Sequence, residues 1–145
     1  YVSATKWVTE LEVTRFADAQ GYWTPRGWSE RGPVKLESRI DTPRNGSTVT
    51  AGKPVAIAGV AWQPHKGVKA VEVRVGGGEW QRAELADSVS ADTWRQWVVR
   101  WTPTSGSHRI EVRATSADGE VQTSVDRPPA PNGATGWHTV TVDAR

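Results

Sequence analysis

Three histidines and the lack of cysteine limit the chemistry that this 145-residue sequence could perform. His65, His108 and His138 lie far apart, and none has a second metal-ligating residue at the spacing that zinc sites use. His138 alternates with Val140 and Val142, which predicts a satisfied, partly buried ring on a strand. His108 follows a turn and is expected to face solvent. The histidines therefore predict no catalytic or metal site.

Carboxylates and glycines add no catalytic pattern. Glu10 and Glu12 fall on one face of a strand-like segment and are typical of a solvated polar stripe. The run Gly76–Gly78 joins two expected strands and does not open a helix, as a phosphate-binding loop would. Without cysteine there is no disulfide, thiolate nucleophile or thiolate metal ligand, and the cellular compartment stays open.

One loop combines two groups that can carry positive charge. His65 and Lys66 lie in the run 63–67 (QPHKG), between two convincing strand patterns. Loops on rigid β-scaffolds often carry binding residues, and a cationic loop suits an oxyanion such as sulfite or nitrate. The alternative, a solvated and positively charged turn, stays open.

Period-2 alternation predicts the elements that position this loop. Val71, Val73 and Val75 share one face of a segment, and Ile110, Val112 and Ala114 share one face of another. Turn signals rich in glycine, asparagine and serine separate such segments. The expected strands cover 7–13, 34–41, 54–62, 68–75, 80–84, 96–102, 108–115 and 136–142. Short strands at this spacing predict an all-β, immunoglobulin-like sandwich of two antiparallel sheets.

One segment also fits a helix. Trp94, Trp97 and Trp101 have the spacing of an amphipathic helical stripe. Trp97, Val99 and Trp101 also alternate as a strand face, and the β-branched Val98–Val99 pair favours that interpretation. We expect a strand from residue 96 onward, and a short helical turn over 87–93 remains compatible with the sequence.

The first 33 residues differ in character from the rest. A strand-like segment is followed by the irregular aromatic run 21–28 (GYWTPRGW). This part is too short for a domain, so we expect residues 1–33 to be the tail of a preceding domain plus a linker, and 34–145 to form the sandwich. The chain is accordingly expected to be a fragment of a longer protein.

Composition excludes two classes of partner. The formal net charge is +2, with both signs interspersed, so no basic stripe indicates nucleic acid. No apolar run approaches the length of about 18 residues that a membrane span needs. Nine of the twelve aromatic residues are tryptophan, a residue type that serves cores, interfaces and sugar-binding platforms alike.

Several motifs, in order, resemble one family. The runs are SATKWVTELEV at 3–13, RGPVKLESRID at 31–41, GVAW at 59–62, HKG at 65–67, VEVRVGGGEW at 71–80, the tryptophans at 94 and 97, RATSADGEVQ at 113–122 and NGATGWHTVTV at 132–142. Together they resemble the C-terminal dimerisation domain of sulfite oxidase-type molybdopterin oxidoreductases, preceded by the tail of the molybdopterin-binding domain. The resemblance covers nearly the whole chain and rests on the order and spacing of these runs.

The resemblance implies an immunoglobulin-like, non-catalytic domain. Its parent would be an oxidoreductase with a molybdenum–molybdopterin centre, whose metal is bound by a cysteine of the preceding domain. The implied partners are that preceding domain and a second copy in a homodimer; a sandwich that serves only as an intramolecular lid is the alternative. A membrane-anchored parent would place the domain outside the cytoplasm, whereas substrate and electron acceptor are left open.

The resemblance also assigns two pairs of residues. Thr5 and Lys6, after Ala4, stand where the family's Ser-Val-Lys triplet contacts the pterin phosphate region. Lys66, with His65 beside it, is the closest match in this sequence to the family's arginine, which reaches from this domain to the substrate anion. Ala4 departs from the pattern by losing a hydroxyl, and Lys66 departs by losing the bidentate fork of arginine.

A second function class stays open. A tryptophan-rich, immunoglobulin-like module could bind carbohydrate or another surface through its aromatic side chains. That function requires several exposed and coplanar tryptophans, whereas strand tryptophans such as Trp62, Trp97 and Trp101 are expected to be buried in the core or in a domain interface.

Overall fold

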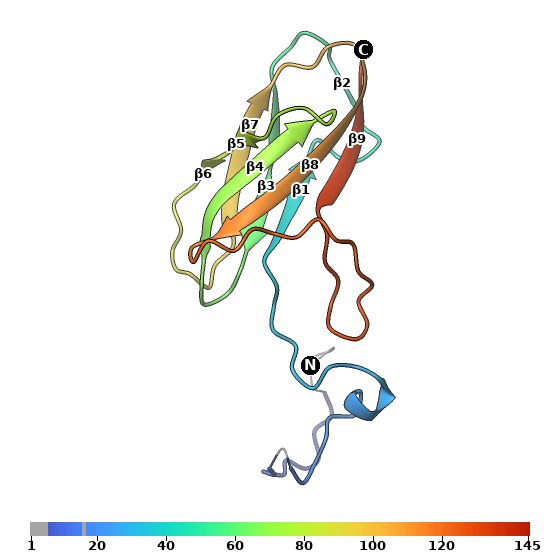
Figure 1. Cartoon of the computed structure of the whole chain (residues 1–145), viewed down its shortest axis with the longest axis vertical. Helices are drawn as coiled ribbons and strands as arrows, with labels where there is room; N and C mark the ends of the chain where they lie inside the picture. The colour runs from blue at the N-terminus through green and yellow to red at the C-terminus, as the bar shows by residue number, and fades with distance from the viewer. Residues whose placement is uncertain (1–5, 16) are drawn as a thin grey trace.

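The computed structural model describes residues 6–15 and 17–145 and shows a two-layer β-sandwich with an extension at its N-terminal end (Figure 1). The strands are β1 (Glu37–Thr42), β2 (Thr48–Val49), β3 (Val55–Trp62), β4 (Val68–Val75), β5 (Gln81–Arg82), β6 (Glu84–Leu85), β7 (Arg95–Trp101), β8 (Gly106–Ser116) and β9 (His138–Ala144). The helical element of the described residues is one 3-10 turn, η1 (Thr24–Arg26). The all-β sandwich predicted from the sequence is confirmed.

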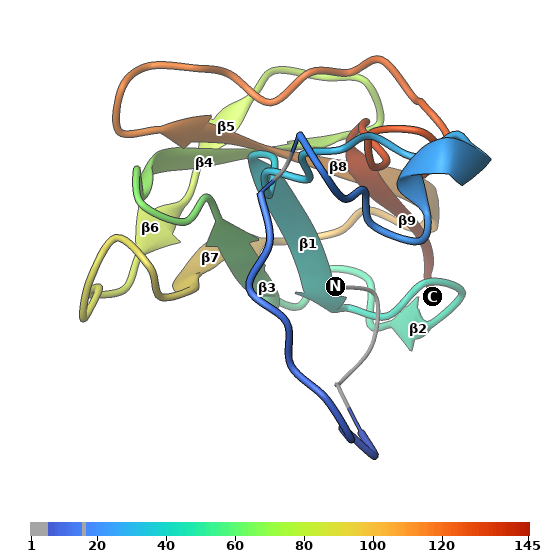
Figure 2. The same ribbon diagram turned by 90° about the horizontal axis from the view of Figure 1, so that it is seen from below.

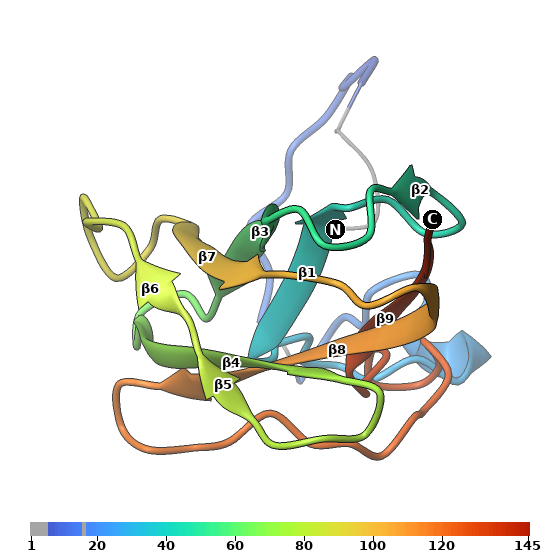
Figure 3. The same cartoon turned by 90° about the horizontal axis from the view of Figure 1, so that it is seen from above.

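The two sheets contain four and five strands. Sheet A has the order β1-β3-β7-β6, and sheet B has the order β2-β9-β8-β4-β5. All strand pairs are antiparallel except β2 with β9. The views along the strands show the sheets as two facing layers, with β1, β3 and β7 in one layer and β4, β8 and β9 in the other (Figures 2 and 3).

The core lies between the two layers and follows the predicted alternation. Six fully buried aliphatic side chains form its centre: Ile57, Val71, Val73, Ile110, Val112 and Val142. Trp97 of β7 also points inward and is almost completely buried. Each such aliphatic side chain contributes roughly 1.5–3 kcal/mol by leaving water, so this layer stabilises the scaffold on which the loops stand.

Short strands that change sheets close both sides of the sandwich. On one side the chain leaves β1 in sheet A and pairs β2 with β9 in sheet B. On the other side β5 pairs with β4 in sheet B, and β6 then pairs with β7 in sheet A. Ala83, between β5 and β6, donates its N–H to Val71 O at 2.8 Å. Short edge strands of this kind limit edge-to-edge pairing with other chains.

Three predicted strands differ from the structure. Residues 7–13 form no strand, because they extend away from the sandwich and meet no neighbouring strand that could pair with them. The strand expected over 80–84 is divided into β5 and β6 by the sheet change at Ala83. The strand expected over 34–41 begins at Glu37, and the two-residue strand β2 was not predicted.

The ambiguous tryptophan segment is a strand. β7 pairs with β3 over its whole length, with Trp97 opposite Gly59 and Trp101 opposite Val55. Trp97 and Val99 are buried, and Trp101 is half-buried against the core. Residues 87–93 form an irregular loop instead of a helical turn. The β-branched pair Val98–Val99 thus correctly indicated a strand.

Candidate functional site

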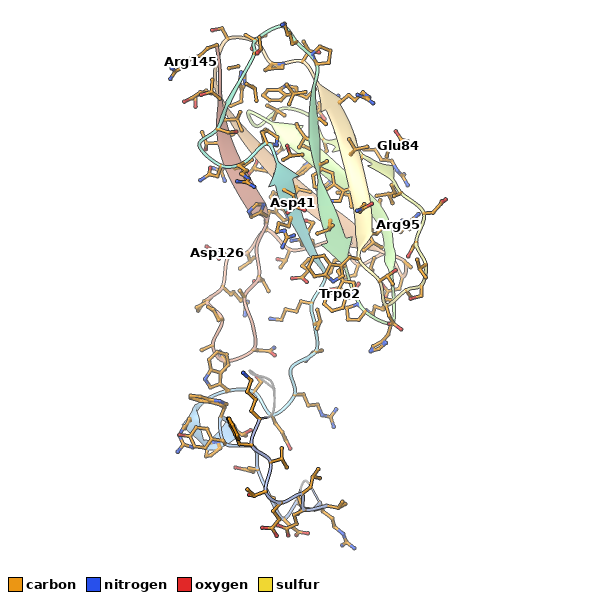
Figure 4. The ribbon with its side chains drawn as sticks, turned by 180° about the vertical axis from the view of Figure 1, so that it is seen from behind. Asp41, Trp62, Glu84, Arg95, Asp126 and Arg145 are labelled. Carbon is orange, nitrogen blue, oxygen red and sulfur yellow. The ribbon has the colours of Figure 1, made fainter. Side chains whose placement is uncertain are left out.

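Four loop regions gather at the end of the sandwich that faces the extension. They are the 63–67 loop between β3 and β4, the 86–94 loop before β7, the 117–120 tip after β8, and the 123–136 loop before β9. Figure 4 shows Trp62 at this end and Asp126 on the 123–136 loop, which projects beyond the sheets. The sandwich therefore brings together segments far apart in the sequence at one surface.

His65 is held by an aspartate of the neighbouring loop. Its backbone N–H and its Nδ1 both contact Asp92 Oδ1, at 2.7 and 2.8 Å. Trp62 Nε1 donates to the backbone oxygen of Asp92 at 3.0 Å. His65 has a φ of 67°, a conformation that is uncommon for residues other than glycine. These contacts fix the position of the imidazole relative to the 86–94 loop.

Lys66 is held by the 117–120 tip. Its Nζ lies 2.8 Å from Asp118 Oδ2 and 3.3 Å from Glu120 Oε2. The hydrogen bond from Lys66, together with one from Ser116, lowers the pKa of Asp118 to about 2. The same two carboxylates raise the pKa of Lys66. His65 and Lys66 are thus both paired with carboxylates of the same domain, and their contact with a substrate anion stays a prediction.

Of the two predicted cofactor-binding residues, the structure describes Lys6, which belongs to the extension and not to this loop. Lys6 is exposed near the start of the extension and forms no hydrogen bond or ion pair with another described residue. Thr5 and Ala4 lie outside the described residues. The role of Lys6 and Thr5 at a pterin phosphate therefore also stays a prediction.

The outer face of sheet B carries a charged network that the sequence did not reveal. Arg74 Nε pairs with Glu111 at 2.6 Å, and Arg113 Nε pairs with Glu72 at 2.8 Å, across the β4–β8 ladder. Alternation correctly placed Glu111 outward, yet its side chain is buried. The hydrogen bond from Arg74 is the main reason why the pKa of Glu111 is lowered.

Two tryptophans cover this network. Trp80 and Trp137 meet edge to face, with ring centroids 5.1 Å apart, although they lie on opposite sides of the β4–β8 pair. The guanidinium of Arg113 lies 4.2 Å from the Trp80 ring centroid, and that of Arg74 lies 4.8 Å from it. Cation–π contacts of this kind are stronger when the cation is desolvated. The charges of this network are consequently paired with one another within the domain.

Two pairs of neighbouring tryptophans are not coplanar. Trp62 and Trp94 are tilted by 40°, and Trp80 and Trp137 by 83°. The guanidinium of Arg39 lies 5.4 Å from the centroid of the exposed Trp94 ring. A flat surface-binding face of stacked indoles, as the second function class requires, is therefore absent from these pairs.

A cleft of about 930 Å³ separates the linker before β1 from the 123–136 loop. We call it the linker–loop cleft; residues 28–38 form one wall and residues 122–139 form the other. Ser29 N donates to Pro131 O at 2.9 Å, and Lys35 Nζ donates to Gly133 O at 2.9 Å. These two bonds hold the walls together, and the two segments run side by side below the sheets in Figure 1.

Gln122 fastens the base of this cleft. Its buried side chain accepts hydrogen bonds from Ser38 Oγ at 2.6 Å and Ala114 N at 3.1 Å, and donates to Gly136 O at 2.8 Å. Its backbone oxygen accepts a hydrogen bond from Trp137 Nε1 at 2.9 Å. One side chain thus joins β1, β8 and both ends of the 123–136 loop. The sequence alone gives no signal for this arrangement.

His138 and His108 are both hydrogen-bonded. Ile40 N donates to His138 Nδ1 at 3.0 Å, which links the edge of β1 to β9. The His138 ring is thus hydrogen-bonded and partly buried, as predicted, although the residue as a whole stands exposed at the first position of its strand. His108 Nε2 contacts Thr104 O at 2.6 Å, and the His108 ring packs edge to face on Trp101. His108 is therefore half-buried, and the prediction that it faces solvent was wrong.

Stability should fall on mild acidification because of His138. Burial of the ring, and then the charge of Arg39, lower the pKa of His138, while Asp41 opposes them. The fold therefore favours the neutral ring, and its contribution to stability is present above a pH of about 6.5 and is lost as the pH falls through the folded pKa. In urea titrations between about pH 7.5 and 5.5, His138→Gln should lose less stability than the wild type. Equal losses in the two proteins would contradict this role for the ring.

The described residues contain neither a cluster of metal ligands nor a membrane-spanning helix. Within 6–15 and 17–145, no three histidine, aspartate or glutamate side chains lie close enough together to hold a metal ion. The part of the chain that the structure describes contains no helix with the length and apolarity needed to cross a bilayer.

Solved structures of other proteins resemble this chain to different degrees. The sulfane dehydrogenase SoxCD from Paracoccus pantotrophus matches with a TM-score of 0.61 and 21% identity, over 77% of this chain and 32% of that chain. The fibronectin(III)-like modules of CbhA from Clostridium thermocellum match with a TM-score of 0.49 and 17% identity, over 74% of this chain and 96% of that chain. An engineered protein matches with a TM-score of 0.46 and 24% identity, over 79% of this chain and 21% of that chain.

The likeness to SoxCD is one of fold, and the chain spans about a third of the length of the SoxCD chain that it matches. The sequence matches none of the curated proteins with which it was compared. The model of the bacterial Ig domain matches residues 37–112, which begin at β1 and end within β8. This match covers slightly more than half of the sequence. The chain therefore belongs to the bacterial Ig domain family.

Proposed function

We propose that the chain is the non-catalytic C-terminal domain of a molybdenum-cofactor oxidoreductase of the sulfite oxidase type. In this proposal it packs against a preceding molybdopterin-binding domain and presents the 63–67 loop toward the substrate. The observation that carries the proposal is the unpartnered apolar surface of the extension before β1. The motif resemblance and the fold likeness to part of a sulfane dehydrogenase support it.

The extension exposes apolar side chains that a free-standing domain would bury. Trp7, Leu11 and Val13 are 95%, 84% and 94% exposed. Their alternation is that of a strand with one apolar face, yet residues 7–13 pair with no other described strand. Exposed apolar patches of this kind mark surfaces that meet another protein body. A sheet of the preceding domain would satisfy both the backbone and the apolar face.

A preorganised aromatic turn follows in the same extension. Pro25 lies in the first turn of η1, and Gly27 caps its end in the left-handed conformation. Arg26 lies over the Tyr22 ring at 3.6 Å and donates to Tyr22 O at 2.6 Å, while Tyr22 and Trp23 meet edge to face. Tryptophan, tyrosine and arginine are the residue types that dominate the energetic centres of protein interfaces. The turn is thus suited to anchor the extension on the preceding domain.

The residues present do not fit a complete molybdenum site. The family's metal ligand is a thiolate, and the sequence contains no cysteine. His65 is engaged by Asp92, and Lys66 by Asp118 and Glu120. In the proposal the preceding domain holds the metal and its pterin, and the present chain supplies packing and charge. A homodimer of the parent is part of the same proposal, to be tested by the mass of the native protein in solution.

Hydrogen exchange tests the proposed packing. Backbone amides of residues 6–28 should have little protection from exchange in the isolated chain, apart from those bonded within the short turns, and should exchange at least about tenfold more slowly in the native full-length protein, because a docked extension is protected. Amides of β8 serve as the control, since that strand is central in both forms. Equal exchange of residues 6–28 in the two samples would show that the extension does not dock, and would remove the main support for the proposal.

Lys66 gives a second test in the full-length enzyme. Lys66→Ala should raise the KM for the oxyanion substrate several-fold, because it removes a cation of the 63–67 loop and leaves Asp118 and Glu120 unopposed. Lys69→Ala is the matched control, since Lys69 is an exposed lysine on the adjacent strand β4. If the two variants had equal and negligible effects on KM, Lys66 would have no role at the substrate.

A further inference from the structure

We propose that the linker–loop cleft is a binding site for an uncharged oligosaccharide. The proposal goes beyond the accessory role described above and does not depend on it. The cleft lies outside the 63–67 loop, and its volume of about 930 Å³ falls within the range of about 300–1,000 Å³ that small-molecule sites occupy. The cleft has two rigid walls, balanced charge, and polar and aromatic groups that are free to bind a ligand.

The walls of the cleft are held in place without a ligand. The bonds from Ser29 to Pro131 and from Lys35 to Gly133 join the linker to the 123–136 loop. Within the loop, Thr135 Oγ1 donates to Val125 O at 2.6 Å, and Gln122 ties both ends of the loop to the sandwich. A preformed cleft loses less conformational freedom on binding than two mobile segments would lose.

Balanced charge makes the cleft better suited to a neutral ligand than to an ion. Arg31, Lys35 and Arg109 face it, and so do Glu37, Glu111 and Asp126. Arg109 and Glu111 neutralise one another at 3.0 Å. Burial raises the pKa of Glu37, and the lowered pKa of His138 favours a neutral ring. An anion would meet carboxylates and a cation would meet guanidinium groups, so neither gains from the cleft as a whole.

Several polar side chains of the cleft have hydrogen-bonding capacity to offer. Among the described residues, no hydrogen bond or ion pair is formed by the side chains of Arg31, Glu37, Ser124, Asp126 and Asn132, all of which line the cleft. They combine donors and acceptors on mainly planar groups. Vicinal hydroxyls of a sugar act as donor and acceptor together, and planar carboxylates, amides and guanidinium groups can bind them in pairs.

Trp28 supplies an apolar surface for a sugar ring. It lines the cleft beside Pro131 and is 37% exposed. Unlike Trp80 and Trp137, it is not packed against another aromatic ring in the described structure. The C–H face of a pyranose can lie against such an indole, while the ring hydroxyls meet the polar groups opposite. The cleft would thus hold a single sugar chain between its two walls. This mode of binding does not need a flat platform of stacked tryptophans.

Isothermal titration calorimetry on the 145-residue chain tests the site with four probes: cellohexaose, the hexamer of N-acetylglucosamine, maltohexaose and an unstructured, uncharged decapeptide. We expect one hexasaccharide to bind with a Kd between about 10 µM and 1 mM, a range usual for modest, largely polar sites. Absence of binding by all three sugars at about 5 mM would overturn the proposal. Binding of the decapeptide alone would overturn it in favour of a peptide site.

Variants connect the binding to the cleft. Trp28→Ala should weaken sugar binding at least tenfold, and Asp126→Asn should weaken it several-fold. Trp94→Ala is the matched control, because Trp94 is 50% exposed yet lies outside the cleft, and it should bind within twofold of the wild type. Unfolding midpoints should confirm that each variant is folded. Unchanged affinity in a folded Trp28→Ala protein would contradict the site. The hydrogen-exchange experiment on residues 6–28 tests the proposed domain packing separately, so the two proposals can fail independently.

Discussion

Gly59→Ala is expected to destabilise the sandwich by more than about 3 kcal/mol, a value at the upper end of overpacking effects. A Cβ atom at position 59 would lie 1.9 Å from the backbone oxygen of Arg39 in β1 and 3.0 Å from the Trp97 ring. Backbone atoms of a paired strand cannot rotate away as a flexible side chain can. Relief of the overlap requires β1 to separate from β3, or Trp97 to leave its buried position.

The neighbours of Gly59 explain why an added side chain would destabilise the fold by steric overlap. Gly59 pairs with Ile40 on one side and with Trp97 on the other, next to the irregularity in β1 between Ile40 and Thr42. The indole of Trp97 packs over the glycine and fills the volume that a side chain would occupy. The φ of Gly59 is not in the left-handed region, so backbone strain does not contribute to the expected destabilisation.

Urea and thermal unfolding measure this effect. The thermal midpoint of Gly59→Ala should fall by about 10 °C or more. Gly32→Ala is the control, because a Cβ at position 32 would meet no atom within 4 Å and its φ is unexceptional. We expect Gly32→Ala to remain within about 0.5 kcal/mol of the wild type. A Gly59→Ala protein as stable as Gly32→Ala would show that β1 and β3 are not packed as described.

Gln122→Leu is expected to cost about 2–4 kcal/mol, because each buried polar group left unsatisfied costs about 1–3 kcal/mol. Leucine has a similar size but cannot accept from Ser38 and Ala114 or donate to Gly136. The Ser38 hydroxyl can turn toward other partners, whereas the Ala114 amide, on a fully buried residue, cannot. The loss should therefore be concentrated at the junction of β8 with the 123–136 loop.

Two measurements separate this effect from a general loss of stability. Gln96→Leu is the control, since Gln96 is exposed on the outer face of β7 and forms no side-chain hydrogen bond with another described residue. Hydrogen exchange of residues 122–137 should accelerate in Gln122→Leu well below the unfolding transition, while β3 and β4 remain protected. Uniform acceleration across the sandwich would contradict the role of Gln122 as the anchor of the loop.

Much of the fold was predictable because alternation records the burial of a two-layer sandwich. Val71 and Val73, and Ile110 and Val112, showed the inner faces of β4 and β8 without reference to any distant residue. The segment 7–13 has the same pattern but forms no strand, because a strand needs a neighbour as well as an alternating sequence. Ala83 was not recognisable as a sheet change, since nothing local distinguishes it from an ordinary strand residue.

The candidate sites were less predictable because they depend on tertiary contacts. The 63–67 loop could be found from its neighbours, but the carboxylates that hold Lys66 come from Asp118 and Glu120, more than fifty positions later. Gln122 is an ordinary polar residue in the sequence and becomes the anchor of a loop only when β1, β8 and β9 meet. Glu111 was correctly placed on an outer face, yet its side chain is buried and pairs with Arg74, whose guanidinium lies against Trp80 and Trp137.

Molybdenum content tests the central proposal most directly. The native full-length protein, captured with an antibody against this chain, and the isolated chain should both be analysed by elemental mass spectrometry. We predict about one molybdenum per full-length chain and none in the isolated domain, since the sequence offers no thiolate to bind the metal. A full-length protein free of molybdenum would contradict the proposal and would leave the likeness to the sulfane dehydrogenase as one of fold alone.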